Sequence, residues 1–284
     1  MPDFVVHDEL ADFWAATEAF YTADPVRHTV ALTAIAHRLA RSTSEAPPDT
    51  LITAHRGSDL VCAAFRMPPH PLVVSAAPLD LVDDLVRLLL ELDREPTGVT
   101  GDRRTAEAFA AAWSARTGCG VTEAMALRLF RLDTLVVPDV PGRMRLATAD
   151  DADLLGRWRR SFIQEAMSHL PADADHAAEI RAQIDHGDAH VLWEVDDVPV
   201  SWAATSAPVH AMSRIAPVYT PPEHRGHGYA AAVTAAVCAW ARKAGSTEVL
   251  LYTDLANPTS NALYQRVGFR PVLDATELAF TTEP

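Results

Sequence analysis

The residues best suited to bind a phosphate lie in one short segment, Val218-Tyr-Thr-Pro-Pro-Glu-His-Arg-Gly-His-Gly-Tyr-Ala230, which runs into an alanine-rich stretch. Two prolines stop the strand that is expected to end at Thr220, and small residues lead into the start of a helix. Backbone N–H groups at a helix start have no partner within the helix, and the helix dipole places partial positive charge there. Gly226 and Gly228 allow a ligand to approach the backbone closely. Taken alone, the segment fits a phosphate site and a plain glycine-rich turn equally well.

A second informative segment follows the next expected strand and reads Asn257-Pro-Thr-Ser-Asn-Ala-Leu-Tyr-Gln-Arg-Val-Gly268. Asn257 is a favoured N-cap residue and Pro258 a favoured first helical residue, so a short helix is expected to begin here. Ser260 and Tyr264 are four residues apart and therefore share one face of this helix. Without further context, Tyr264 is read either as a functional hydroxyl or as a core aromatic whose hydroxyl is satisfied.

The elements that must position these segments recur in the same order in both halves of the chain. At 284 residues the chain exceeds the usual size of one domain. The C-terminal half has expected strands and helices at residues 143–146, 148 onward, 190–195, 198–204, 214–220, 228–244, 248–253, 258–267 and 277–280. The N-terminal half has a similar series at residues 51–56, 60–67, 72–76, 79–94, 97–101, 103–117 and 124–132. Two prolines between 137 and 142 interrupt any regular element, so two similar α/β domains are expected, at 1–137 and 142–284.

The two segments together resemble the motifs of the GCN5-related N-acetyltransferase (GNAT) superfamily. Arg225-Gly-His-Gly-Tyr-Ala230 is similar to the pyrophosphate-binding motif Arg/Gln-x-x-Gly-x-Gly/Ala, and residues 257–269 are similar to a second motif, Asn…Ala-Leu-Tyr…Gly-Phe. They lie one helix and one strand apart, as in the family. The resemblance is close over about 215–272 and rests on element order alone over 143–213. It implies two tandem GNAT-like domains, each a mixed, mostly antiparallel sheet flanked by helices with a splayed central strand pair.

The resemblance also implies an N-acetyltransferase that uses acetyl-CoA as co-substrate, without a metal, and acetylates a primary amine by direct attack in a ternary complex. Loop N–H groups would hold the pyrophosphate, and the strand edge would pair with the pantetheine arm. Tyr264 would donate a proton to the departing thiolate. An acetyl-CoA-binding sensor without catalysis and a transferase of another acyl group remain alternatives. The implied cofactor contacts are Val218, Tyr219, Thr220, Arg225, Gly226, His227, Gly228, Tyr229, Ala230, Asn257, Ser260, Asn261 and Tyr264.

The residue that accepts the amine's proton is less clearly marked in the sequence. Glu165, near the end of the helix that begins at Ala149, is favoured because this helix borders the acceptor side in the family. Glu194 on the expected hairpin and His210 in the next loop are further candidates. A surface salt bridge is the competing interpretation of either glutamate. The same helix carries three apolar residues that line either an acceptor pocket or the core, namely Trp158, Phe162 and Met167.

The N-terminal half departs from both motifs. Asp80, Asp83 and Asp84 lie at or near the start of its first long helix, where they complement the helix dipole and would repel a pyrophosphate. Residues 102–118 have neither an Asn-Pro opening nor a late tyrosine. A degenerate, non-catalytic N-terminal domain that packs on the active one and shapes its acceptor cleft is therefore expected.

Composition narrows the partners. The net charge of −14 argues against nucleic acid, because phosphate binding needs concentrated Lys and Arg, and it leans slightly toward a small cationic amine. No apolar run approaches the ~20 residues that cross a membrane, and the acidic start is unlike a secretory signal, so a cytoplasmic location is expected. Three scattered cysteines fit reduced thiols, with Cys238 buried in a helix. No set of His, Cys, Asp and Glu has zinc-site spacing.

Overall fold

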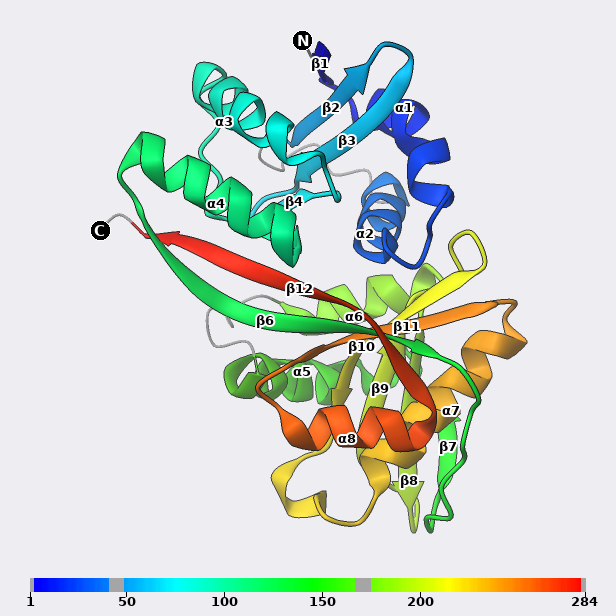
Figure 1. The fold of residues 1–284 in the computed structure, drawn as a ribbon. Coiled ribbons are helices and arrows are strands. Elements are labelled where there is room, and N and C mark those ends of the chain that lie inside the picture. Colours follow the sequence, from blue (N-terminus) through cyan, green and yellow to red (C-terminus); the bar gives the residue numbers. More distant parts are fainter. Residues whose placement is uncertain (1–2, 41–48, 167–174, 282–284) are drawn as a thin grey trace. The chain divides into compact units, whose positions relative to one another are not determined.

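The computed structural model describes residues 3–40, 49–166 and 175–281. They form two compact units that exchange segments of the chain (Figure 1). Unit 1 comprises Met1–Arg128, Asp254–Ala256 and Leu273–Pro284, and unit 2 comprises Leu129–Thr253 and Asn257–Val272. Among the helices in the described ranges, none combines the length and apolar character needed to cross a membrane.

Unit 1 is a mixed sheet with helices packed against it. Its strands lie in the order β1-β2-β3-β4-β5-β12-β6, and from β1 to β12 the pairs are antiparallel except for the parallel pair β4–β5. The side chains of Phe109 and Trp113 on α4 stack 6.1 Å apart within its core. The elements are β1 (Asp3–Val6), α1 (Leu10–Thr22), α2 (Thr29–Ala40), β2 (Thr50–Arg56), β3 (Asp59–Arg66), β4 (Leu72–Val74), α3 (Val82–Glu91), β5 (Gly98–Asp102), α4 (Arg103–Thr117), the first part of β6 (Gly120–Leu132) and the last part of β12 (Phe269–Thr281).

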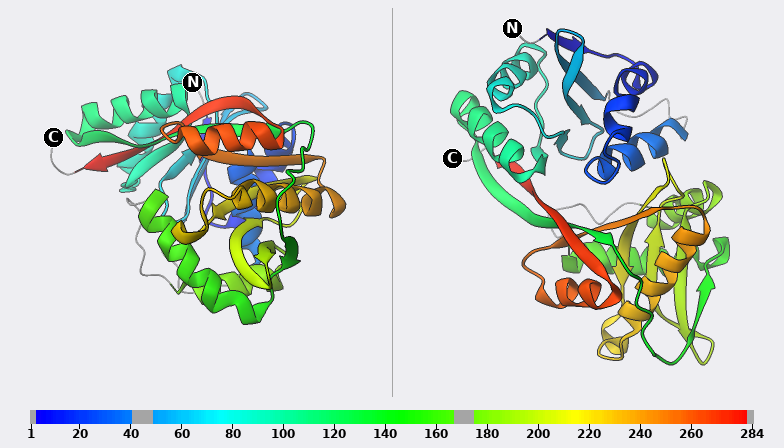
Figure 2. Two further views of the ribbon diagram at one scale, coloured as in Figure 1. Left: turned by 90° about the horizontal axis from the view of Figure 1, so that it is seen from below. Right: turned by 45° about the vertical axis from the view of Figure 1, so that its right-hand side comes forward.

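Unit 2 repeats this pattern. From β11 to β7 its strands lie in the order β11-β10-β9-β8-β7, with the single parallel pair β10–β11. Helices α5 and α6 cover one face of the sheet, and α7 packs against the other (Figure 2). The elements are β7 (Arg143–Leu146), α5 (Ala152–Ala166), α6 (His176–Asp185), β8 (Ala189–Val195), β9 (Val198–Thr205), β10 (Met212–Tyr219), α7 (Tyr229–Lys243), β11 (Glu248–Asp254) and α8 (Pro258–Val267).

Two irregularities in β10 shape the site. Its pairing with β11 runs only as far as Ile215 opposite Leu251, although β10 continues to Tyr219, so the two central strands part as expected. A register shift against β9 lies between Ile215 and Val218. An extra residue in a strand moves the following side chains to the opposite face. Val218 accordingly packs with the α7 side of the sheet, and Tyr219 packs with the α5 side.

The expected single boundary between residues 137 and 142 does not separate the two units. The chain already enters unit 2 at Leu129, where Phe130 and Leu132 are buried in that unit's core. In return, Leu278 of β12 pairs with Val99 of β5 and packs in the core of unit 1. The strands expected at 124–132 and 277–280 both exist, but each ends in the sheet of the other half. The reason is that a buried strand can be paired by any sheet with an open edge, and alternation in the sequence does not specify which.

Candidate active site

The loop before α7 presents a row of backbone N–H groups. Those of His224 and Arg225 donate to the carbonyls of Pro221 and Pro222. The next five, at residues 226–230, donate to no atom among the residues that the structure describes. Gly226 and Gly228 both have φ of +83°, a conformation that other residues rarely adopt. The exposed loop can therefore offer consecutive N–H donors to an anion.

The electrostatics of α7 favour an anion at this end. Its first turn carries no acidic residue, and Arg242 and Lys243 lie in its last turn, where they complement the negative end of the dipole. Gly228 is the N-cap residue and provides no side chain that would occupy the helix N–H groups. A Cβ at Gly228 would lie 3.1 Å from Cγ2 of Val140. Because no side chain caps the helix, the N–H groups of its first turn stay available to a ligand.

The end of β10 has one paired and one open edge. Val218 and Tyr219 pair with β9, while the edge toward β11 has no β11 partner beyond Ile215. The hydroxyl of Ser201 donates to the carbonyl of Tyr219 over 3.1 Å and bonds the Thr220 hydroxyl over 2.8 Å. These contacts fix the backbone at the point where the strand turns into the loop.

Helix α8 begins as its sequence predicts. The side chain of Asn257 accepts the N–H of Ser260 over 3.0 Å, and Nδ2 of Asn261 donates to the Asn257 carbonyl over 2.7 Å. Tyr264 lies edge-on to the ring of Phe269, with centroids 6.0 Å apart. Its hydroxyl makes no hydrogen bond within the described part of the chain, and burial raises the pKa of Tyr264 well above its usual value. The group is therefore a protonated donor at neutral pH.

Glu165 lies beside the loop, at the end of α5. Its Oε1 accepts the hydroxyl of Tyr219 over 3.0 Å, and its Oε2 accepts Nη2 of Arg225 over 2.6 Å. Arg225 also donates from Nε to the Thr220 carbonyl over 2.9 Å. Burial and the nearby Glu165 carboxylate raise the pKa of Tyr219. Trp158 packs 6.3 Å from the Tyr219 ring, which extends this contact along α5.

A protein-family model described as "Acetyltransferase (GNAT) family" matches residues 154–269, a range that contains Glu165, the loop and Tyr264. Residues 154–269 form a GNAT domain. The resemblance drawn from the motifs is confirmed for this range. No curated protein matches the chain.

Solved structures extend the likeness in fold beyond the GNAT domain. A Drosophila protein is 13% identical with a TM-score of 0.66, and the match covers 99% of each chain. A GCN5-related N-acetyltransferase from Sphaerobacter thermophilus is 15% identical with a TM-score of 0.62, covering 99% of this chain and 98% of that one. A tandem GNAT protein from the clavulanic acid biosynthesis pathway is 13% identical with a TM-score of 0.58, covering 99% of this chain and 98% of that one. The expected fold class, α/β with a large, mostly antiparallel sheet flanked by helices, is confirmed.

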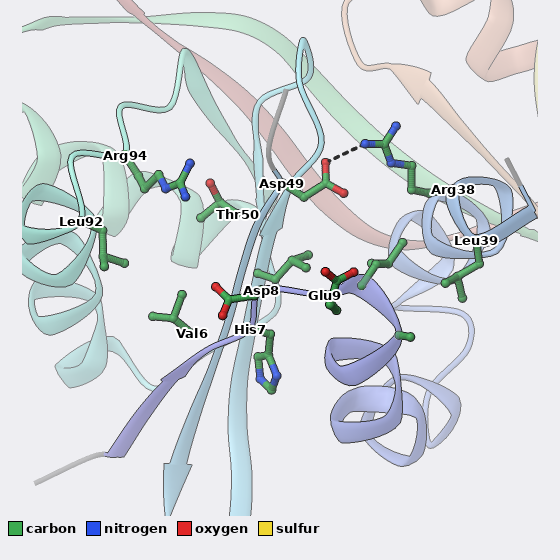
Figure 3. Close-up of a pocket in the computed structure, with 13 residues that line it drawn as sticks. Val6, His7, Asp8, Glu9, Arg38, Leu39, Asp49, Thr50, Leu92 and Arg94 are labelled. Carbon is green, nitrogen blue, oxygen red and sulfur yellow. Dashed lines mark hydrogen bonds and ion pairs between the residues drawn. The ribbon is translucent and has the colours of Figure 1, made fainter. Parts of the chain in front are cut away.

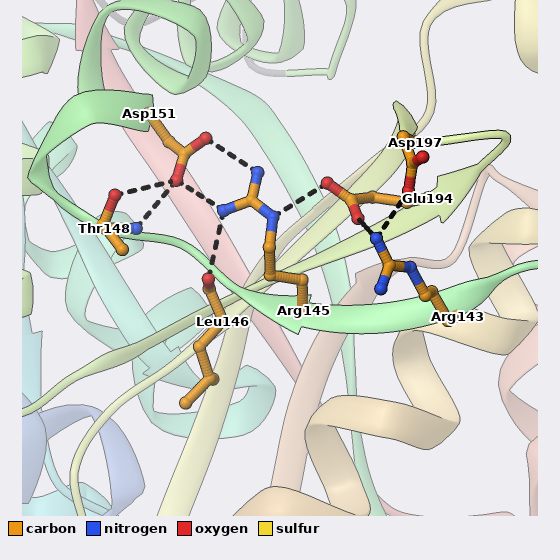
Figure 4. Close-up of polar contacts among 7 residues, drawn as sticks. All are labelled: Arg143, Arg145, Leu146, Thr148, Asp151, Glu194 and Asp197. Carbon is orange, nitrogen blue, oxygen red and sulfur yellow. Dashed lines mark hydrogen bonds and ion pairs between the residues drawn. The ribbon is translucent and has the colours of Figure 1, made fainter.

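The other two proton-acceptor candidates lie elsewhere in the GNAT domain. Glu194 is buried, and its carboxylate binds Arg145 and Arg143 (Figure 4). His210 is exposed in a tight turn before β10. Seven residue steps of about 3.3 Å separate the start of β10 from Tyr219, so His210 lies roughly 23 Å from the loop end of the strand. Neither residue meets the loop. Met167 lies outside the described residues.

The sequence predicted only backbone roles for Tyr219 and Arg225, and the structure adds the contacts of their side chains with Glu165. Pro217, inside an expected strand, was the available signal, because proline within a strand often marks an irregularity. The shift beside it turns Tyr219 toward α5. Cys238 is buried as expected. Within residues 3–40, 49–166 and 175–281, no group of three or more His, Cys, Asp or Glu residues is arranged to hold a metal.

A separate cavity of about 440 Å³ lies in unit 1 (Figure 3). Arg38 and Asp49 form an ion pair of 3.3 Å in its wall, and Arg94 also lines it. Asp8 and Glu9, at the start of α1, contribute negative charge. None of the predicted site residues belongs to this cavity, so it does not enter the assignment of the active site.

Proposed function

We propose that the chain is an N-acetyltransferase that moves the acetyl group of acetyl-CoA to a primary amine by direct attack in a ternary complex. The observation that carries the proposal is the row of N–H groups at residues 226–230, open at the positive end of α7. The same domain supplies a protonated hydroxyl at Tyr264. An anion site can hold the coenzyme's pyrophosphate, and a proton donor can neutralise the departing thiolate.

The residues around the loop fit coenzyme A. N–H groups from Arg225 to Ala230 hold the pyrophosphate in this proposal, and the open β10 edge at residues 218–220 pairs with the pantetheine arm. Asn257, Ser260 and Asn261 contact the remaining cofactor. Since Oδ1 of Asn257 already accepts the Ser260 N–H, its amide nitrogen is the atom left for the cofactor.

The proposed reaction conserves protons through two side chains. The amine nitrogen attacks the thioester carbonyl carbon, the carbon–sulfur bond breaks, and the electron pair stays on sulfur. Tyr264 donates its proton to this thiolate and regains one from solvent. Glu165 accepts the proton that the amine loses. The raised pKa of Tyr264 keeps the donor protonated before each cycle.

Unit 1 is proposed to be a degenerate copy without a cofactor. Asp83, in the first turn of α3, accepts Nη2 of Arg116 over 2.7 Å and lies 3.8 Å from Arg87. Asp80 is paired with Arg56 just before the helix. These carboxylates place negative charge at the helix start where unit 2 has open N–H groups, which supports a unit 1 that binds no pyrophosphate.

The acceptor is proposed to be a small cationic amine, since the chain carries a net charge of −14 and long-range attraction concentrates ligands of opposite charge. The cysteines at positions 62, 119 and 238 are free, which supports the cytoplasmic location that we propose.

Replacing Tyr264 by phenylalanine tests the function. Loss of a general acid typically lowers turnover by about 10²- to 10⁴-fold, and we expect a loss in this range on any amine that the wild type acetylates. CoA affinity, measured by calorimetry, and the melting temperature are expected to stay unchanged, because the hydroxyl bonds no described residue. Full turnover in Tyr264→Phe would remove Tyr264 from the mechanism.

The same amine panel separates the alternatives. Wild-type protein that binds CoA but acetylates no amine would favour a sensor. Faster transfer from propionyl- or longer acyl-CoA at equal concentration would assign a different donor. Neither outcome depends on the choice of proton acceptor, so each bears on the activity alone.

A further inference from the structure

Arg225 connects the loop before α7, where the cofactor is proposed to bind, to helix α5. It directly precedes the open N–H groups of residues 226–230, and its guanidinium donates to the Thr220 carbonyl and the Glu165 carboxylate. The guanidinium carbon also lies 5.9 Å from the centre of the Tyr219 ring. One side chain is thus shared between the elements proposed to bind the two substrates.

The contact with Glu165 has a cost for catalysis. Both carboxylate oxygens already accept hydrogen bonds, one from Tyr219 and one from Arg225. Each oxygen keeps a further lone pair, but a cationic amine that approaches the carboxylate meets the positive charge of Arg225 beside it. Arg225 is the partner that can leave, since the pair is half exposed, at 48% for Arg225 and 42% for Glu165. Exposed pairs contribute only about 0.2–1 kcal/mol.

The proposed pyrophosphate offers Arg225 a better partner. Guanidinium groups bind phosphate through paired, charge-assisted hydrogen bonds, and the phosphate would lie beside the residue's own backbone. When Arg225 turns to the phosphate, Oε1 of Glu165 keeps its bond from the Tyr219 hydroxyl. The carboxylate would then stay in place with Oε2 free.

We propose that Arg225 exchanges partners: it neutralises Glu165 in the free protein and moves to the pyrophosphate when the cofactor binds, which exposes the carboxylate to the amine. The inference rests on the proposed function. It makes Arg225 a positioning residue and predicts that cofactor binding prepares the acceptor site. By linkage, whatever removes the Glu165 pair strengthens cofactor binding.

A double-mutant cycle on CoA affinity tests the exchange without knowledge of the acceptor. We expect Glu165→Gln to tighten CoA binding by about 1.4- to 5-fold, the factor that corresponds to an exposed pair. Arg225→Gln is expected to weaken CoA binding, and adding Glu165→Gln to it is expected to change nothing further. Pantetheine, which lacks the pyrophosphate, is expected to bind wild type and Glu165→Gln equally.

Asp153→Asn is the matched control. Asp153 also lies on α5 and forms an exposed ion pair of 2.7 Å with Arg181. Its replacement by asparagine removes one negative charge, as Glu165→Gln does. It is expected to leave CoA affinity unchanged. Calorimetry on the 284-residue chain gives all of these affinities.

Two results would overturn the exchange. If Glu165→Gln tightens CoA equally with and without Arg225, simple repulsion between carboxylate and phosphate is the cause. If Glu165→Gln weakens CoA binding, Arg225 binds Glu165 and the phosphate at the same time. If it leaves CoA affinity unchanged, Arg225 does not bind the phosphate. Failure of the proposed function gives a different result. The wild type then binds no CoA, or it gives the expected double-mutant cycle in CoA affinity but acetylates no amine.

Discussion

Replacing Glu194 by alanine tests whether this carboxylate stabilises the GNAT domain or takes part in its chemistry. Its side chain is only 6% exposed, with Oε1 2.8 Å from Nε of Arg145 and Oε2 3.4 Å from Nη2 of Arg143. Arg145 also binds both oxygens of Asp151, over 2.8 and 2.9 Å (Figure 4). The arrangement is a closed network of charges in which every member has a partner.

The magnitude follows from these contacts. A hydrogen bond between charged groups contributes about 1.5–3 kcal/mol, and the exposed contact of Arg143 adds about 0.2–1 kcal/mol. Stripping the partner from a buried charge costs about 3–5 kcal/mol, but Arg145 keeps Asp151 and is not left alone. We therefore expect Glu194→Ala to lower the free energy of unfolding by about 2–4 kcal/mol. Glu194→Gln retains an acceptor for Arg145 and is expected to lose less.

In a urea titration, we expect Glu194→Ala to unfold at a lower urea concentration than the wild type. The dependence of the unfolding free energy on urea concentration is expected to stay unchanged. CoA affinity and turnover, measured well below the unfolding transition, are expected to equal those of the wild type. The opposite pattern, with stability intact and turnover lost by more than about 100-fold, would show that Glu194 acts in proton transfer. That result would refute its assignment as a structural ion pair.

Three further outcomes follow from the structure. The neighbouring guanidinium of Arg145 holds the pKa of Asp151 below its usual value. The stability that Asp151 contributes is therefore complete above about pH 4 and is lost as the pH falls through its folded-state pKa. Urea titrations between pH 5 and 3 should show a smaller loss of stability in Asp151→Asn than in the wild type. Ending the chain before Leu273 removes the segment that pairs with β5, and light scattering should report association through that open edge. A thiol reagent should modify partly exposed Cys119 in the folded protein and reach the other two cysteines only on unfolding, because they are buried and burial raises their pKa.

Local features of the site could be predicted from the sequence because their causes lie within a few residues. Asn257 caps α8 because an asparagine side chain reaches the N–H three residues ahead. Gly228 ends the loop in a left-handed conformation that glycine adopts without strain. The same reasoning located the start of α7 and the position of Tyr264 near the end of α8.

The contacts that join the site could not be predicted in this way. Glu165 is separated from Tyr219 by 54 residues and from Arg225 by 60. Their meeting depends on a one-residue register shift that turns Tyr219 to the α5 face. Without that shift, the alternation of the strand would place the Tyr219 side chain on the α7 side. A sequence pattern gives the period of a strand but not a local change in its phase.

The exchange of strands also means that the GNAT domain needs residues outside its matched range in order to fold. The family match begins at residue 154, yet Phe130 and Leu132 are buried in the core that also contains Val233 of α7 and Phe269. A segment cut to residues 154–269 would therefore leave an apolar gap beneath α7, the helix that follows the loop of residues 220–228. Removing one large buried side chain costs about 2–5 kcal/mol, and two such losses approach the whole stability of a domain. The residues that mark the chemistry thus lie in the second half of the chain, while the core that holds their loop in place begins at Leu129.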